Sequence, residues 1–190
     1  MGDKATWLRH KDEDEYYSPL ILTDVIVPYI PLGAVVWCPF DTKDSEFVHS
    51  LSRDHEVIYS HIWTGQNFFE YEPKHWDVVV SNPPFTLKLE VLKRLYKFGK
   101  PFALVLPLTM LNYNEVGNFF LDKELQLLIV DKKVSFNGNP ASFNSSYFCS
   151  KLLPRDLMFH HLEHNNTGKN FTPSRMLTSG APKNIEGYLF

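Results

Sequence analysis

Short runs of apolar, β-branched residues recur along the chain. They are continuous rather than alternating, which is typical of strands that are covered on both faces. The runs are residues 34–37, 56–59, 77–80, 102–106 and 127–130. The pattern therefore predicts a set of short, buried strands.

Between these runs lie stretches with the apolar spacing of helices, notably residues 44–53 and 87–98. Gly99 follows the second stretch in the position of a C-terminal cap. Strands that alternate with helices predict an α/β fold, with a doubly wound, mostly parallel sheet and helices on both faces. In such sheets, ligands bind beyond the carboxyl ends of the strands, near the point where the strand order reverses.

The length and composition indicate one globular domain. A chain of 190 residues with 44% hydrophobic content is long enough to bury one core. The last stretch, residues 165–190, is rich in Asn, Thr, Ser, Gly and Pro and has no periodicity. We therefore expect a single domain over residues 1–164, followed by a loosely ordered or extended tail.

The charge balance excludes a protein that coats nucleic acid by charge alone. The formal net charge is -3, whereas such proteins usually carry a basic face. Positive side chains do cluster after residue 85, at Lys88, Lys93, Arg94, Lys97 and Lys100. They are either a local contact for nucleic acid or a solvated helix face, and the second reading is the commoner one for such a run.

Cysteine and histidine usage gives no sign of a metal centre. Cys38 and Cys149 have apolar surroundings and no paired spacing, which indicates neither a zinc site nor a disulfide framework. His160, His161 and His164 are the closest histidines, and they lack a carboxylate or cysteine partner in a defined pattern. We expect a reduced, cytoplasmic protein with no metal, no signal peptide and no membrane association.

Chemistry is concentrated at Ser81-Asn82-Pro83-Pro84-Phe85, directly after a buried run. Proline cannot donate to a sheet ladder, so the strand has to stop there. The loop then offers carbonyl acceptors, an amide and an aromatic face. That combination suits a planar heterocycle with an exocyclic amine, such as adenine. The alternative is a simple strand-terminating turn, because Asn and Pro are common turn formers.

The tetrapeptide Asn82-Pro83-Pro84-Phe85 resembles the catalytic motif of amino-group methyltransferases that act on adenine in DNA or RNA. Over roughly residues 14 to 160, the chain is similar to a small phage- or mobile-element-borne branch of that family. The resemblance implies a Rossmann-like methyltransferase fold with a terminal antiparallel hairpin. It also implies S-adenosylmethionine as the cofactor and these four residues as the catalytic ones.

Other segments resemble the cofactor-binding parts of the family. They are a tyrosine-rich turn with a proline before the first helix, the loop after the first strand, and a later aromatic segment. The cofactor-binding residues that the resemblance implies are Tyr16, Tyr17, Ser18, Pro19, Trp37, Pro39, Phe40, Asp41, Asn67, Phe68 and Asn82. Residues 102–107, Phe136 and residues 145–149 correspond to the later strands and the hairpin.

The implied mechanism is one of positioning and electrostatics. The lone pair of an adenine amino group is delocalised into the ring, which makes it a poor nucleophile. If the Asn82 side-chain oxygen and the Pro83 carbonyl each accept one amino hydrogen, the lone pair localises and points at the incoming methyl group. Phe85 would hold the base by stacking, and a base in duplex DNA would first have to be flipped out.

The chain departs from the family at two places. The first-strand loop of most members is rich in glycine, which lets the backbone approach the cofactor closely, but this chain has no glycine between Gly33 and Gly65. The position before Phe68 is usually acidic in the family, whereas here it is Asn67. An amide oxygen still accepts a hydrogen bond from the cofactor's adenine, but without a charge.

The sequence leaves two classes of function open. The first is methylation of an adenine amino group in nucleic acid, with DNA favoured over RNA. The second is a non-catalytic binding protein on the same fold, such as a phage inhibitor of a host defence protein. Because the chain has no separate target-recognition domain, we expect weak sequence specificity, a single-stranded substrate, or a partner subunit, including a second copy of the chain.

Overall fold

The structure is a computed structural model, and it describes residues 20–131 and 145–162. Its strands are β1 (Val35–Cys38), β2 (Glu56–Tyr59), β3 (Val78–Ser81), β4 (Phe102–Pro107), β5 (Gln126–Val130), β6 (Ser145–Ser150) and β7 (Leu157–His160). Its α-helices are α2 (Leu20–Ile26), α3 (Glu46–Leu51), α4 (Lys88–Phe98) and α5 (Asn114–Phe120). Short 3-10 helices are η2 (Val27–Tyr29), η3 (Ile62–Thr64), η4 (Phe85–Leu87) and η5 (Leu108–Asn112).

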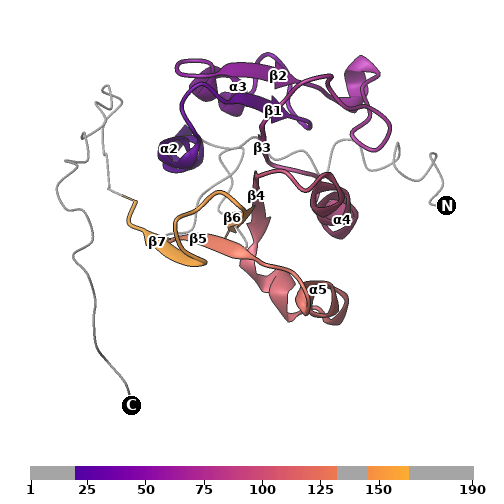
Figure 1. Cartoon of the computed structure of the whole chain (residues 1–190), viewed down its shortest axis with the longest axis vertical. Coiled ribbons are helices and arrows are strands. Elements are labelled where there is room, and N and C mark those ends of the chain that lie inside the picture. Colours follow the sequence, from indigo (N-terminus) through magenta and orange to yellow (C-terminus); the bar gives the residue numbers. More distant parts are fainter. Residues whose placement is uncertain (1–19, 132–144, 163–190) are drawn as a thin grey trace.

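The strands form one seven-stranded sheet in the order β2-β1-β3-β4-β6-β5-β7. Strands β2, β1, β3 and β4 are parallel neighbours. The chain runs outward from β1 to β2 and then returns to place β3 on the other side of β1, so the strand order reverses between β1 and β3. The predicted Rossmann-like, doubly wound α/β fold is thus confirmed, with α2 and α4 on opposite sides of the central strands (Figure 1).

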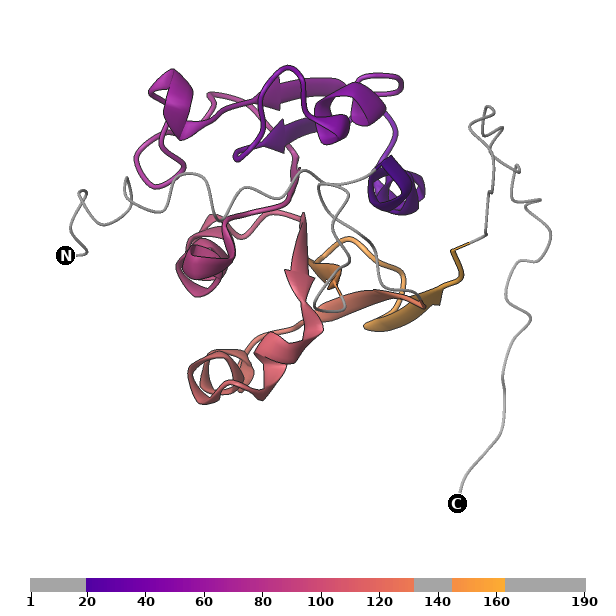
Figure 2. The same ribbon diagram turned by 180° about the vertical axis from the view of Figure 1, so that it is seen from behind.

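The predicted antiparallel hairpin is present as β5 and β6, which pair in antiparallel orientation. Strand β6 is inserted between β4 and β5 and is antiparallel to both. The sheet then gains a strand that we did not predict, because β7 adds to β5 in parallel orientation. Figure 2 shows β7 as the outermost strand at the edge of the sheet away from β2.

Alternate residues of the strands supply two cores, one on each face of the sheet. Val36, Cys38, Val78 and Val80 face α2 and α3, where they meet helix residues such as Phe47. The other face, against α4 and α5, holds Trp37, Val79, Phe102, Leu104 and Phe148 together with Leu92 and Val116 of the helices. We call this second cluster the α4/α5 core. Burial on both faces explains why these strands read as continuous apolar runs.

Helix α4 confirms the predicted helix and its C-terminal cap. Leu89, Leu92 and Leu95 recur on the buried side of the helix. Gly99 adopts the left-handed conformation, with a φ of 70°, and its N–H donates to the Leu95 carbonyl. A residue without a Cβ is favoured in that conformation.

The buried titratable groups make stability depend on pH. Burial raises the pKa of the Cys149 thiol, and burial together with the nearby Asp41 raises that of Cys38. Burial, reinforced by Cys149 and other acidic groups, raises the pKa of the Tyr147 phenol. In an unfolded chain, thiols titrate at about 8.5 and phenols at about 10.

We therefore expect the free energy of unfolding to fall as the pH rises above about 8.5, because the unfolded state then loses protons that the folded state keeps. Urea unfolding at neutral pH, and again at a pH close to the pKa of a free tyrosine, about 10, checks this expectation. A free energy of unfolding that stays constant into the alkaline range would contradict it.

Candidate active site

Two loops meet at the carboxyl edge of the sheet, at the point where the strand order reverses. The loop after β1 contains Pro39, Phe40 and Asp41, and the loop after β3 begins at Asn82. Because β1 and β3 are parallel neighbours, both loops leave the same edge side by side. The Ser81 hydroxyl donates a hydrogen bond to a carboxylate oxygen of Asp41, and both residues are buried. This bond joins the last residue of β3 to the loop after β1, 40 residues away in the chain.

The tetrapeptide after β3 is held in a defined turn. Pro83 is buried, while Asn82, Pro84 and Phe85 are half-buried, and the Oδ1 atom of Asn82 is shielded from solvent. Pro84 precedes η4, and its carbonyl accepts from Leu87 N at 3.1 Å. The Phe85 ring packs against the α4/α5 core with one part exposed. The loop therefore combines a fixed backbone, a buried amide oxygen and a partly exposed ring.

Asn67 and Phe68 reach the same region from the segment after η3. The Asn67 side-chain oxygen accepts from Phe69 N at 3.1 Å, and its carbonyl accepts from Tyr71 N at 2.8 Å. Asn67 is therefore the first residue of a tight turn, a role that favours asparagine. The Phe68 ring lies 4.9 Å from that of Phe40, which brings this turn against the loop after β1.

The Trp37 ring, which we expected at the cofactor, is a core group in the structure. It is fully buried and packs 5.5 Å from Phe68 and 5.3 Å from Trp76. Its indole N–H donates to the Ser60 hydroxyl at 3.0 Å. Trp37 follows a residue that faces α2 and α3, so alternation along β1 turns its side chain to the α4 side. Trp37 contributes to the site indirectly, because its ring packs against Phe68 and holds that side chain in place.

Two members of the basic cluster after residue 85, Arg94 and Lys100, contact rings and carbonyls of the protein itself. The Arg94 guanidinium lies 4.7 Å from the Phe98 ring and 5.5 Å from the Phe68 ring, and Nη2 donates to the Tyr71 carbonyl. Lys100 lies 4.1 Å over the Trp76 ring and donates to its carbonyl. Both cations therefore stabilise the packing of the 67–76 segment on α4.

Four predicted cofactor residues lie outside the described part of the chain: Tyr16, Tyr17, Ser18 and Pro19. So do Phe136, which we assigned to the later strands, His164 and the predicted tail over residues 165–190. Their assignments stay predictions. Within residues 20–131 and 145–162, no three His, Cys, Asp or Glu side chains are grouped so that they could hold a metal ion. The helices of those same segments include none with the length and apolar character to cross a membrane.

Sequence reasoning missed the bond between Ser81 and Asp41. One signal was available, because Ser81 is the single polar residue in the buried strand β3. A buried hydroxyl needs a hydrogen-bond partner, and here the loop of the neighbouring strand supplies it.

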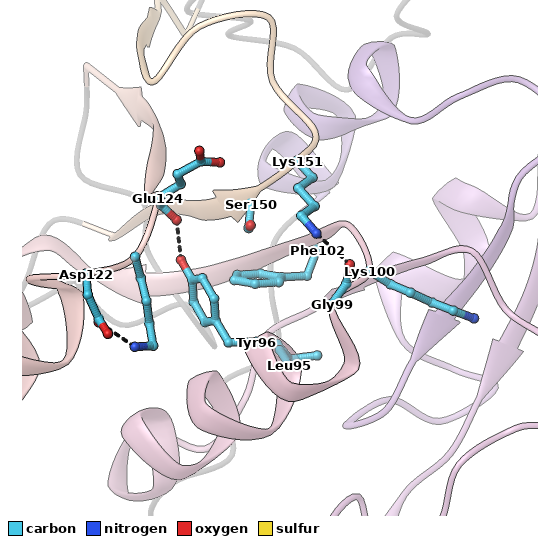
Figure 3. Close-up of a pocket in the computed structure, with 10 residues that line it drawn as sticks. Leu95, Tyr96, Gly99, Lys100, Phe102, Asp122, Glu124, Ser150 and Lys151 are labelled. Atoms are coloured by element: carbon cyan, nitrogen blue, oxygen red, sulfur yellow. Dashed lines mark hydrogen bonds and ion pairs between the residues drawn. The ribbon is translucent and has the colours of Figure 1, made fainter.

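A pocket of about 300 Å³ lies at the opposite ends of the strands from the candidate site, beside the start of β4 and the end of α4 (Figure 3). The Tyr96 hydroxyl donates to the Glu124 carbonyl at 2.5 Å, and Lys151 donates to the Gly99 carbonyl at 2.8 Å. Burial raises the pKa of Tyr96 to about 12, so this phenol stays protonated. Several polar groups of the pocket thus bind one another, Lys100 donates to the Trp76 carbonyl outside it, and none of the predicted site residues lines it. We therefore place the candidate site at the carboxyl edge.

Comparisons with known proteins gave one match among curated sequences. The chain is 37% identical over 54 residues to the type II methyltransferase M.EcoRI of Escherichia coli. The matched segment is 28% of this chain and spans only 17% of the length of that enzyme. No protein-family model matches the chain.

Two solved structures have a partly similar path of the chain. A dimethyladenosine transferase from Plasmodium falciparum is 15% identical, with a TM-score of 0.46 over 74% of this chain and 63% of its own. A predicted O-methyltransferase from Agrobacterium tumefaciens is 11% identical, with a TM-score of 0.41 over 82% of this chain and 92% of its own.

Proposed function

We propose that this protein is an S-adenosylmethionine-dependent methyltransferase that acts on the exocyclic amino group of adenine in nucleic acid, with DNA favoured over RNA. One observation carries the proposal: Asn82-Pro83-Pro84-Phe85 begins where β3 ends, at the reversal of strand order, and Ser81 ties it to the loop after β1. Ligands of doubly wound sheets bind at this position. The sequence match to M.EcoRI, an enzyme named as a methyltransferase, supports the same chemistry.

The residues after β3, on one side of the reversal of strand order, suit the target adenine. Asn82 and the Pro83 carbonyl would accept the amino hydrogens of the target adenine and localise its lone pair. The part of Phe85 that is exposed would stack on the base, while the rest of the ring anchors it in the core. The rigid turn keeps these groups in place without reorganisation during the reaction.

The residues after β1 and η3 fit the cofactor by their chemistry. Asp41 is a buried carboxylate that the bond from Ser81 holds at the end of the loop after β1, where it would lie beside a cofactor bound at this edge. The half-buried Phe40 ring packs against the buried Phe68 ring and would contact the cofactor's adenine. Asn67 at the start of the adjoining turn would accept from the adenine amino group. When bound, S-adenosylmethionine supplies an activated methyl group.

The proposal is tested by titrating the protein with S-adenosylmethionine in a calorimeter and by following labelled methyl groups into oligonucleotides that contain adenine. We expect binding and incorporation at the adenine amino group, mapped by sequencing methylated adenines in DNA and RNA from expressing cells. No binding at millimolar cofactor would contradict the proposal.

The second candidate function, a non-catalytic binding protein on the same fold, rests on the uncharged Asn67. In the structure its side-chain oxygen already accepts a backbone hydrogen bond from Phe69. A neutral acceptor that also holds a turn would bind an adenine amino group more weakly than a carboxylate would. This candidate predicts a folded protein that does not bind the cofactor.

Asn67→Asp separates the two candidates. An aspartate still caps the turn through the bond to Phe69 N and adds a charge, and a charge-assisted hydrogen bond is about twice as strong as a neutral one. We expect cofactor affinity to rise about tenfold, which is ~1.4 kcal/mol. Calorimetry and the melting temperature, measured on the same samples, check this.

Asn118→Asp, an exposed position on α5, is the matched control and should leave affinity unchanged. If Asn67→Asp instead lowers the melting temperature and no cofactor binds, the new charge is buried beside apolar rings without a partner. That result would support the non-catalytic protein.

A further inference from the structure

An exposed aromatic ring stands at the carboxyl end of β4, next to the tetrapeptide. Tyr113 follows η5, and its backbone N–H donates to the Met110 carbonyl at 3.0 Å. Met110 and Val116 on either side of it are buried, whereas Tyr113 is 54% exposed. Because β4 is the parallel neighbour of β3, the segment that follows β4, with η5 and Tyr113, begins at the same ends of the strands as the loop that starts at Asn82.

Lys88 connects this ring to the tetrapeptide. Its Nζ donates to the Phe85 carbonyl at 2.9 Å and lies 5.5 Å from the centre of the Tyr113 ring. An ammonium group has three N–H donors, and the bond to Phe85 uses one of them. A positive charge and an exposed ring are therefore held together within a few ångströms of the residue that we assign to the target base.

The position of this pair relative to the strand reversal indicates what it binds. The loops after β1 and η3, which suit the cofactor, lie on the β1–β2 side, while Tyr113 and Lys88 lie on the β3–β4 side with the tetrapeptide. Trp63, another exposed ring, is 46% exposed but follows β2 and packs 4.4 Å from His61. Among the strongly exposed rings of residues 20–131 and 145–162, Tyr113 is the one that lies beside the proposed target base.

We propose that Tyr113 and Lys88 bind the nucleotide next to the target adenine in a single-stranded nucleic acid. The Tyr113 ring stacks on the neighbouring base, and Lys88 contacts the phosphate between the two nucleotides. An unpaired base offers its face to a ring, which is how proteins bind single strands without reading their sequence. The inference rests on the proposed function, because that function places the target base at Asn82 and Phe85.

A single strand fits the charge distribution better than a duplex does. Binding to duplex DNA depends on many contacts between cations and phosphates, whereas this chain has a net charge of -3. Arg94 and Lys100 are engaged with rings and carbonyls of the protein itself. One cation and one ring suffice for a short stretch of unpaired strand.

The test measures binding of a fluorescently labelled single-stranded oligonucleotide with one adenine, by anisotropy, without cofactor. We expect Tyr113→Ala to raise Kd about tenfold, which is ~1.4 kcal/mol, and Tyr113→Phe to bind as the wild type does. Phe159→Ala is the matched control, because that ring is 70% exposed and lies on β7, the edge strand that β6 and β5 separate from β4. Lys88→Gln removes one contact with a phosphate. The plot of the logarithm of the association constant against the logarithm of the salt concentration should therefore become less steep by about 0.7.

Equal affinity of Tyr113→Ala and the wild type would overturn the inference, as would tighter binding of the same sequence as a duplex. Methyl transfer to adenine that Tyr113→Ala leaves unchanged contradicts this inference but not the proposed function. Binding that depends on Tyr113, without any methyl transfer by the wild type, supports this inference and contradicts the proposed function alone.

Discussion

Replacing Asn82 with alanine should lower the rate of methyl transfer to adenine by about two to three powers of ten. The substitution removes one acceptor for the amino hydrogens and leaves β3 and both prolines intact. Cofactor affinity should change little, because the other residues proposed for the cofactor, such as Phe40 and Asn67, lie on the other side of the strand reversal. Initial rates with labelled cofactor, together with calorimetric titration of the same variant, measure both quantities.

Asn82→Asp keeps an acceptor oxygen at this position and should retain more activity than the alanine variant. Asn118→Ala, in the exposed part of α5, serves as the control for loss of an asparagine. If Asn82→Ala transfers methyl groups at the wild-type rate, the tetrapeptide is a strand-terminating turn and nothing more.

The largest loss of stability is expected for Trp37→Ala. The ring is fully buried among aromatic side chains, and removal of a buried tryptophan costs about 3–5 kcal/mol through lost transfer free energy and the cavity that remains. The substitution also leaves the Ser60 hydroxyl without its indole donor. Urea unfolding followed by circular dichroism gives the change in the free energy of unfolding.

Trp37→Phe fills part of the same space and should cost less than the alanine variant. A ring that contacted the cofactor directly would behave differently, because its removal would weaken cofactor binding while the free energy of unfolding stayed close to that of the wild type. Calorimetry and urea unfolding on both variants therefore decide between the core position and the contact that the sequence predicts.

Strands β1, β3 and β4 could be predicted because they are apolar along almost their whole length and fully buried. Val78-Val79-Val80 is apolar throughout, since both faces of β3 are covered. The prediction that residues 56–59 form a buried strand was wrong in its burial, because β2 lies at the edge of the sheet and its end residues are exposed. Strand β7 could not be predicted in this way. Its residues alternate between exposed and half-buried, with Phe159 exposed, so it lacks the continuous apolar run of a strand covered on both faces.

The end of β3 at the tetrapeptide was predictable, whereas the contacts around it were not. Two prolines after an apolar run mark the end of a strand by local stereochemistry alone. By contrast, the pairing of Ser81 with Asp41 and of Lys88 with Tyr113 depends on which strands become neighbours. The direction of the Trp37 ring depends on which helix covers each face, and sequence spacing does not determine that.

The insertion of β6 between β4 and β5 ties the completion of the sheet to a late part of the chain. Until residues 145–150 have been synthesised, β4 has no partner on one side and β5 cannot join the sheet. A nascent chain that has emerged only as far as β5 would therefore present the unpaired edge of β4, with its apolar residues from Phe102 to Leu106. Unpaired strands of this kind pair readily with other chains. The period before β6 emerges from the ribosome is thus the stage of biosynthesis at which this protein is most exposed to aggregation.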